Sequence, residues 1–186
     1  RVTTVKPSGT TSCVLGTSSG IHAWHNDFYI RRIRVGKNEA IYDYLAINHP
    51  ELVEDDFFKA DTQAIISIPQ RAPENGILRH ETSIELLNRV KDIYERWIAP
   101  GHTSGNNTHN VSCTVSVKEE EWDEVGKWMW ENREFYNGLS VLPYYGGTHK
   151  QMPFEDTDEQ TFNDLFNNLT EVDLSGVVEV IDNTNL

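Results

Sequence analysis

Cysteine is scarce in this sequence of 186 residues. Cys13 and Cys113 are the only two, too few for the disulfide framework that stabilises small secreted domains. The sequence also lacks a long apolar run, so it offers neither a membrane-spanning segment nor the hydrophobic part of a secretory signal peptide. Together these absences predict a cytoplasmic protein with no membrane partner.

Basic residues are also few. Lysine and arginine number 16 against 29 aspartate and glutamate residues, and the formal net charge is −13. A surface of this sign repels nucleic acid and anionic lipid, so neither is an expected partner. An anionic ligand would have to be bound locally, by loops and helix dipoles. The chain is long enough for one core, and we predict a single domain over residues 1–186.

The Walker pattern G-x-x-x-x-G-K-[ST] is missing, which argues against a P-loop ATPase. Another stretch has the chemistry of an anion site: Thr3-Thr4-Val5 reads as a strand ended by Pro7, and hydroxyls around one glycine follow. Donors at a helix start, with hydroxyls and a close approach at glycine, can hold phosphate. On local chemistry alone, a solvated turn is the alternative. The candidate phosphate-binding residues are Ser8, Gly9, Thr10, Thr11 and Ser12.

Short strands alternate with helices along the rest of the chain. Apolar alternation predicts further strands over residues 28–35 and 110–117, and short segments ended by proline predict strands over residues 62–68 and 139–142. Helical spacing predicts helices over residues 37–48, 82–98, 119–136 and 157–169. Helix starts are signalled at Thr82, Ser116 and Thr157. This order is typical of an α/β fold with parallel strands and crossover helices. A last apolar segment is expected at 177–181.

Several histidines and both cysteines are candidates for chemistry. Cys13 and Cys113 match no thiol motif and read as small buried hydrophobes. The histidines have no carboxylate or cysteine at a matching spacing, which favours loop hydrogen bonding over metal binding. These histidines are His22, His25, His102 and His109. We therefore assign no catalytic residue and no metal ligand to this chain.

Six blocks of the sequence resemble, in order, the C-terminal part of the catalytic subunit of ribonucleotide reductases. The adenosylcobalamin-dependent class is the most similar. The blocks are KPSGTTS (6–12), LGTSSGIHAWH (15–25), YIRRIRVGKNEA (29–40), HTSGNNTHNVSCTVSV (102–117), NGLSVLPYYGGTHKQMPFED (137–156) and VDLSGVVEVIDNT (172–184).

The resemblance implies the C-terminal part of a ten-stranded α/β barrel, in which the PSGT-type loop holds the substrate's phosphates. It implies radical removal of the ribose 2′-hydroxyl, with adenosylcobalamin as cofactor of the complete enzyme. The implied partners are a ribonucleotide substrate and the N-terminal part of the same enzyme, and the oligomeric state stays open. Because the family's subunit is several times longer and this chain begins at Arg1, we expect a fragment that is inactive alone.

Two alternatives remain at this point. One is the same chemistry with a diiron radical partner, whose class carries radicals along a tyrosine pair. Pro143 occupies the first position of that pair here, which leaves Tyr144 and Tyr145 out of register and favours the cobalamin class. The other is a non-catalytic nucleotide-binding module, or a subunit that only completes a split enzyme.

Overall fold

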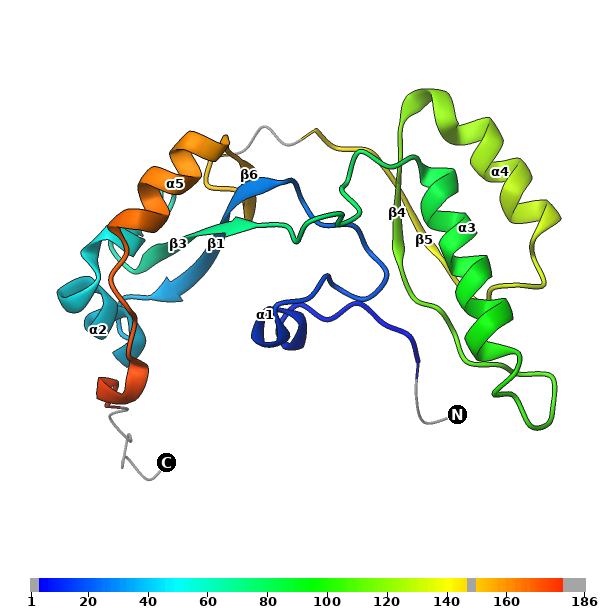
Figure 1. Cartoon of the computed structure of the whole chain (residues 1–186), viewed down its shortest axis with the longest axis horizontal. Coiled ribbons are helices and arrows are strands. Elements are labelled where there is room, and N and C mark those ends of the chain that lie inside the picture. Colours follow the sequence, from blue (N-terminus) through cyan, green and yellow to red (C-terminus); the bar gives the residue numbers. More distant parts are fainter. Residues whose placement is uncertain (1–3, 147–149, 179–186) are drawn as a thin grey trace. The chain divides into compact units, whose positions relative to one another are not determined.

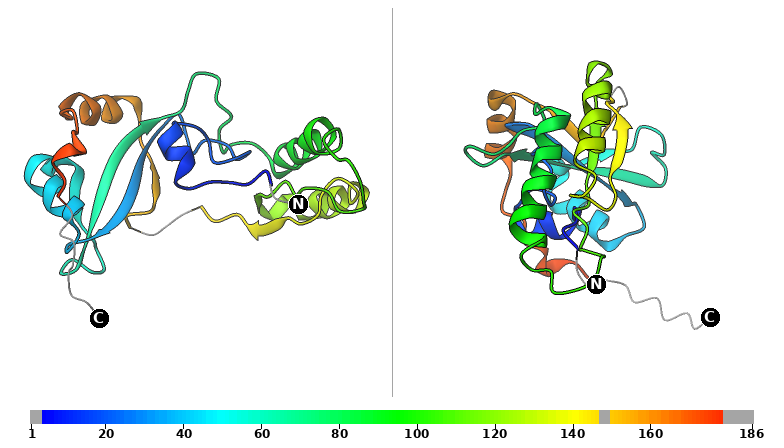
Figure 2. Two further views of the ribbon diagram at one scale, coloured as in Figure 1. Left: turned by 90° about the horizontal axis from the view of Figure 1, so that it is seen from below. Right: turned by 90° about the vertical axis from the view of Figure 1, so that its right-hand side faces the viewer.

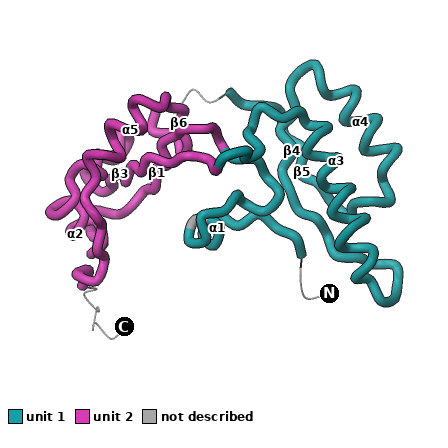
Figure 3. The backbone as a smooth tube through the Cα atoms, in the orientation of Figure 1, with its two compact units in different colours: residues 1–24, 74–146 teal, residues 25–73, 147–186 magenta. Residues whose placement is uncertain are grey.

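The computed structural model describes residues 4–146 and 150–178. The chain forms two compact units, Arg1–Trp24 with Glu74–Gly146 (unit 1) and His25–Pro73 with Gly147–Leu186 (unit 2), coloured separately in Figure 3. Each unit has its own hydrophobic core. Within the described residues, no helix combines the length and apolar character needed to cross a membrane.

Unit 1 contains a parallel β-α-β arrangement, as the alternation of strands and helices predicts. Strand β4 (Thr114–Val117) leads through the short η3 (Glu119–Glu121) and helix α4 (Trp122–Glu131) to β5 (Ser140–Pro143), which pairs with β4 in parallel. Val115 and Val117 are buried while Thr114 and Ser116 are exposed, because successive side chains of a strand point to opposite faces. Figure 1 shows both strands beside the helices of this unit.

Helix α3 (Ser83–Ile93) packs against β4 and α4 in the core of unit 1, and it lies next to α4 in Figure 2. It starts with the predicted capping box, in which Thr82 Oγ1 accepts from the Glu85 N–H and the Glu85 carboxylate accepts from the Thr82 N–H. The predicted helix continues to Ile98, but its last part is the π-helix η2 (Tyr94–Ile98). Buried residues of the core include Leu87, Val90, Val111, Val115 and Val125.

The N-terminal segment joins this sheet at one point. Val5 forms an isolated parallel bridge with Val111: its N–H donates to Asn110 O at 3.1 Å, and its carbonyl accepts from the Ser112 N–H at 2.7 Å. The parallel direction predicted for this segment is confirmed, but the pairing is a single bridge. Thr3, the first residue of the predicted strand, lies outside the described residues.

Unit 2 corrects the prediction that the strands are all parallel. Its four-stranded sheet has the order β2-β3-β1-β6, with every pair antiparallel. Both predicted strands are present as β1 and β3, but a strand's sequence pattern has the same period in both directions, so it cannot determine direction. The strands are β1 (Phe28–Gly36), β2 (Val53–Asp55), β3 (Gln63–Arg71) and β6 (Phe154–Asp156).

The helical segments of unit 2 are α2 (Ala40–Asn48), η1 (Pro50–Leu52), α5 (Glu159–Asn168) and η4 (Leu174–Gly176). Helix α5 contacts β1 and β3. Two arginines of β1 form ion pairs with acidic residues. Arg32 contacts Glu54 and Glu155, and Arg34 contacts Asp56.

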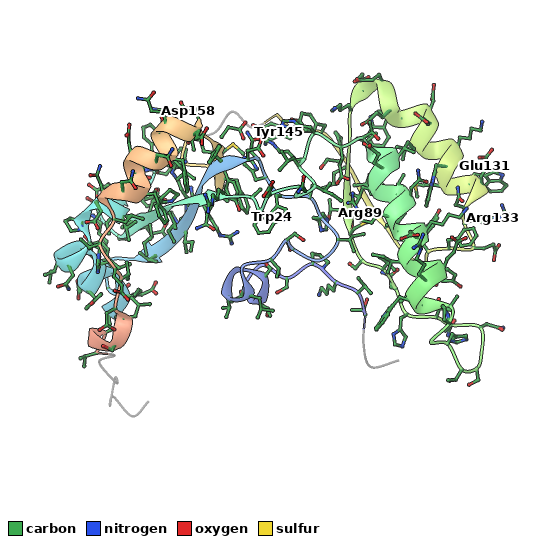
Figure 4. The ribbon with its side chains drawn as sticks, viewed as in Figure 1. Trp24, Arg89, Glu131, Arg133, Tyr145 and Asp158 are labelled. Atoms are coloured by element: carbon green, nitrogen blue, oxygen red, sulfur yellow. The ribbon has the colours of Figure 1, made fainter. Side chains whose placement is uncertain are left out.

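Several predicted boundaries are wrong by a residue or more. Helix α5 is capped by Asp158, labelled in Figure 4, whose carboxylate accepts from the Thr161 N–H, and not by Thr157. Ser116 is not the N-cap of the next helical segment, because η3 begins at Glu119 with Lys118 as its N-cap. Strand β3 continues through Pro69, which is tolerated because β2 pairs with β3 only from Ala64 to Ile66. Most of the apolar segment at 177–181 lies outside the described residues.

Glu121 connects the starts of two helical segments in unit 1. Its buried carboxylate accepts from the Ser83 N–H (3.0 Å), Ser83 Oγ (2.8 Å) and the Lys118 N–H (2.9 Å). Burial by itself would raise the pKa of Glu121, but these donors outweigh it and hold the pKa below its ordinary value of 4.5. A group with a lowered pKa stabilises the fold fully above its unfolded-state pKa, and that stability is lost as pH falls through the folded-state pKa.

We therefore expect Glu121→Gln to lower the free energy of unfolding of unit 1 at pH 7 by about 1–3 kcal/mol, because the amide cannot satisfy all three donors. The difference from wild type should shrink as the pH falls below about 4.5. All five tryptophans lie in unit 1, so tryptophan fluorescence during urea unfolding measures this unit. The control is Glu120→Gln at the exposed neighbour. Equal stabilities for the two variants would contradict this account.

Candidate functional site

The hydroxyl-rich loop begins directly after the bridge at Val5 and leads into the short helix α1 (Thr11–Leu15). Ser8 organises it: its Oγ accepts from the Thr11 N–H at 3.0 Å, and its carbonyl accepts from the hydroxyls of Ser12 and Ser19. The Ser8 side chain thus caps the start of α1. The first turn of the loop is therefore held by its own hydroxyls.

The five predicted phosphate-binding residues are adjacent but differ in exposure. Gly9, Thr10 and Thr11 are exposed, Ser8 is half-buried and Ser12 is buried. The Ser12 hydroxyl donates its proton to the Ser8 carbonyl, so it supports the loop from within. Thr10 and Thr11 are the hydroxyl-bearing residues of the loop that are exposed to solvent. Phosphate binding by these residues remains a prediction.

Two glycines of this segment, Gly9 and Gly20, differ in their surroundings. Gly20 has φ +61°, and a Cβ built on it would lie 3.0 Å from the Pro7 backbone, so only glycine permits this close approach. Gly9 is not among the glycines with positive φ, and nothing lies within 4 Å of a Cβ at that position. The backbone conformation of Gly9 therefore does not require glycine, whereas the open space around it is compatible with the predicted close approach of a ligand.

The turn that follows α1 is attached to two other elements of unit 1. His22 Nδ1 lies 2.9 Å from the Ser19 carbonyl, and His22 Nε2 accepts from the Thr114 N–H at 3.1 Å. Arg89 of α3, labelled in Figure 4, donates to the Ile21 carbonyl at 2.9 Å. The Arg89 guanidinium also forms an ion pair with Glu81. These contacts hold the turn against the start of β4 and against α3.

The sequence contains no local signal for the contact between His22 and Thr114. The two residues are 92 positions apart, and a histidine in a loop has many possible partners. The general expectation that these histidines make loop hydrogen bonds is confirmed for His22 and for His102, whose Nε2 lies 2.7 Å from Gly105 O. In the described residues, no three His, Cys, Asp or Glu side chains are grouped as a metal site.

The remaining candidates are placed as follows. Cys113 is buried, as predicted, and desolvation raises its pKa to about 11. The side chain of Cys13 lies outside the described part of the chain. Tyr144 and Tyr145 are exposed. A hollow of about 610 Å³ lies at the end of η2, where Trp97 is 73% exposed, and none of Ser8 to Ser12 lines it.

Comparison with known proteins confirms the resemblance seen in the sequence. The chain is 28% identical over 183 residues to an adenosylcobalamin-dependent ribonucleoside-triphosphate reductase of Lactobacillus helveticus (strain DPC 4571), which covers 98% of this chain. It is 30% identical over 183 residues, 92% of this chain, to a probable adenosylcobalamin-dependent ribonucleoside-triphosphate reductase of Dictyostelium discoideum. The chain spans only 23% and 22% of the lengths of these two relatives. No protein-family model matches it.

The same likeness is found in the fold. The crystal structure of a B12-dependent (class II) ribonucleotide reductase matches with a TM-score of 0.69 and 24% sequence identity, over 88% of this chain and 22% of that chain. The mixed α/β arrangement, with its parallel and antiparallel strands, is therefore the fold of part of such a reductase.

The geometry of the glycines yields a prediction about the loop. Gly20→Ala should lower the free energy of unfolding of unit 1 by about 1–2 kcal/mol, because the new Cβ meets the Pro7 backbone at a positive φ. Gly9→Ala should stay within about 0.5 kcal/mol of wild type. Urea unfolding followed by tryptophan fluorescence measures both. If Gly9→Ala destabilises unit 1 as much as Gly20→Ala does, the described loop conformation is wrong.

Proposed function

We propose that this chain is part of a ribonucleotide reductase that makes deoxyribonucleotides by radical removal of the ribose 2′-hydroxyl. The observation that carries the proposal is sequence similarity of 28–30% over more than nine-tenths of the chain to reductases of one named activity. Those relatives are named ribonucleoside-triphosphate reductases, so the proposed substrate is a ribonucleoside triphosphate. The complete protein would act in the cytoplasm.

Both units would belong to one domain, the C-terminal part of a ten-stranded α/β barrel. Two features support this. Among residues 4–146 and 150–178, the parallel pair β4 and β5 is extended only by the single bridge at Val5, which leaves strand edges for further strands. The relatives are also more than four times longer than the matched segment, so other parts of the protein are available to supply those strands. The N-terminal part of the same enzyme is therefore the proposed partner.

The proposed role of this chain is to bind the substrate's phosphates through the loop from Ser8 to Ser12. The exposed Thr10 and Thr11 hydroxyls would donate to phosphate oxygens, and Gly9 would allow a close approach. Ser8 and the buried Ser12 would fix the loop conformation through their mutual hydrogen bond. A loop built in this way can hold an anion in a chain of net charge −13, because its donors act over hydrogen-bond distances.

The cofactor of the complete protein is proposed to be adenosylcobalamin, which supplies the radical. The described residues place no three metal-ligating side chains together, and their geometry identifies no corrin contact. We therefore assign none of them to the cofactor and derive no catalytic step from this chain. A diiron radical partner is the competing source of the radical.

The first experiment separates these sources and tests the need for the rest of the enzyme. The isolated chain, given adenosylcobalamin, dithiol and CTP, should form no dCTP, because Cys13 and Cys113 match no thiol motif and the cysteines that such a reductase uses for radical and redox chemistry would lie elsewhere. The complete protein should form dCTP only when adenosylcobalamin is added. Turnover by the isolated chain would refute the proposed division of roles. Turnover by the complete protein without cobalamin would favour the diiron alternative, and no turnover under either condition would favour a non-catalytic module.

The second experiment tests the loop in the complete protein. Thr10→Ala should weaken CTP binding by roughly 10- to 150-fold, since a hydrogen bond to a charged group contributes about 1.5–3 kcal/mol. Binding of cytidine, which has no phosphate, should not change. The matched control is Thr17→Ala, at an exposed threonine in the following turn. Isothermal titration measures the affinities of wild type and both variants for CTP and for cytidine. Equal losses for CTP and cytidine, or no loss for either, would rule out phosphate binding by Thr10.

A further inference from the structure

The candidate loop is attached at both of its ends to one short stretch of the chain. Before the loop, Val5 bonds to Asn110 and Ser112 through backbone groups. After the loop, His22 bonds to Thr114, two residues further along the same stretch. The first attachment uses only peptide groups, which do not titrate. The second uses an imidazole, which does.

The partners of His22 determine which ring nitrogen carries the proton. The Thr114 N–H is a donor, so Nε2 must be the unprotonated acceptor of the neutral ring. The proton then resides on Nδ1, where it is donated to the Ser19 carbonyl at 2.9 Å. In the imidazolium form both nitrogens carry hydrogen, so Nε2–H would oppose the Thr114 N–H and the contact would be lost.

The contact reaches the loop through Ser19. The Ser19 carbonyl accepts from both the Nδ1 and the backbone N–H of His22, and Ser19 Oγ donates to the Ser8 carbonyl at 3.1 Å. The Ser8 carbonyl also accepts from the hydroxyl of Ser12. A continuous series of hydrogen bonds therefore leads from the start of β4 through His22 and Ser19 to the carbonyl that closes the first turn of the loop.

The titratable groups on the neighbouring elements differ from His22 in type. Arg89 and Glu81 pair with each other next to Ile21, and Lys6 precedes the Pro7 backbone against which Gly20 packs. Cys113, which precedes Thr114, has its pKa raised to about 11 and stays a thiol. Of these side chains, the imidazole is the one in which uptake of a proton turns a hydrogen-bond acceptor into a donor at the Thr114 contact.

We propose that His22 is a positioning residue that holds the phosphate-binding loop against β4 in its neutral form and releases it when protonated. The inference rests on the proposed function of the loop. It adds a pH-dependent control of substrate binding that arises from a residue outside the loop itself.

Binding of CTP to the complete protein at pH 8 and pH 5.5 tests the proposal. The phosphates of CTP also titrate, so the comparison is made between variants at each pH. His22→Gln places an amide oxygen where Nε2 accepts and cannot gain a proton. We expect wild type to lose about 2- to 10-fold more affinity than His22→Gln between the two pH values, the equivalent of one hydrogen bond. At pH 8, His22→Ala should bind CTP about 2- to 10-fold more weakly than wild type does.

The matched control is His80→Gln, a replacement at an exposed histidine of the same unit, which should keep the wild-type pH dependence. The proposal is overturned if wild type and His22→Gln lose the same affinity on acidification. The proposal is also overturned if His80→Gln reduces the loss of CTP affinity between pH 8 and pH 5.5 as much as His22→Gln does.

A measurement without nucleotide separates failure of this inference from failure of the proposed function. In ¹⁵N NMR spectra of the 186-residue chain at pH 8, the His22 ring should show the proton on Nδ1. Amide exchange at Thr114 should quicken on acidification relative to His22→Gln. If these signals appear but CTP does not bind wild type, the contact exists and the loop function is wrong. If His22 shows the other tautomer, the contact itself is refuted.

Discussion

The pairing of Val5 with Val111 is the interaction on which the candidate site depends. Two backbone hydrogen bonds, of 3.1 and 2.7 Å, make the N-terminal segment part of the structure that includes β4. The loop from Ser8 to Ser12 follows immediately, so its position is set by the sheet and not by its own short helix. Loops that bind ligands need a rigid element to position them. Here that element is the stretch from Asn110 to Thr114.

Polar groups are used within unit 1 in two distinct ways. Glu121, Ser83 and Lys118 form a buried group in which the carboxylate satisfies donors from two helix starts, so its function is structural. In the loop, by contrast, some hydroxyls are used internally while those of Thr10 and Thr11 lie on exposed residues. The negative charge of Glu121 is thus stabilised inside unit 1 by two backbone N–H groups and the Ser83 hydroxyl. The exposed donors of the loop leave room for an anion from outside.

Local signals predicted local features well. The apolar residues at alternate positions from 111 to 117 correctly indicated a strand, although β4 itself covers only Thr114–Val117, and Thr82 with Glu85 correctly indicated the start of α3. The direction of β1 and β3 could not be predicted, because alternation is the same for both directions. The five site residues came from composition and resemblance. The sequence could not show that the Ser12 hydroxyl is used internally or that His22 reaches Thr114, since hydrogen bonds between distant residues depend on the folded chain.

Neither compact unit is formed from a continuous piece of chain, because the backbone passes between the units after Trp24, Pro73 and Gly146. This has a consequence for synthesis on the ribosome. The stretch to which Val5 and His22 attach is made about 90 to 110 residues after these two residues, on the order of ten seconds at typical elongation rates. Until then Val5 and His22 lack these two attachments, while the antiparallel pair β1 and β3 is already complete. The attachment of the loop to the stretch from Asn110 to Thr114 therefore forms after β1 and β3 can pair, although the loop precedes both strands in the sequence.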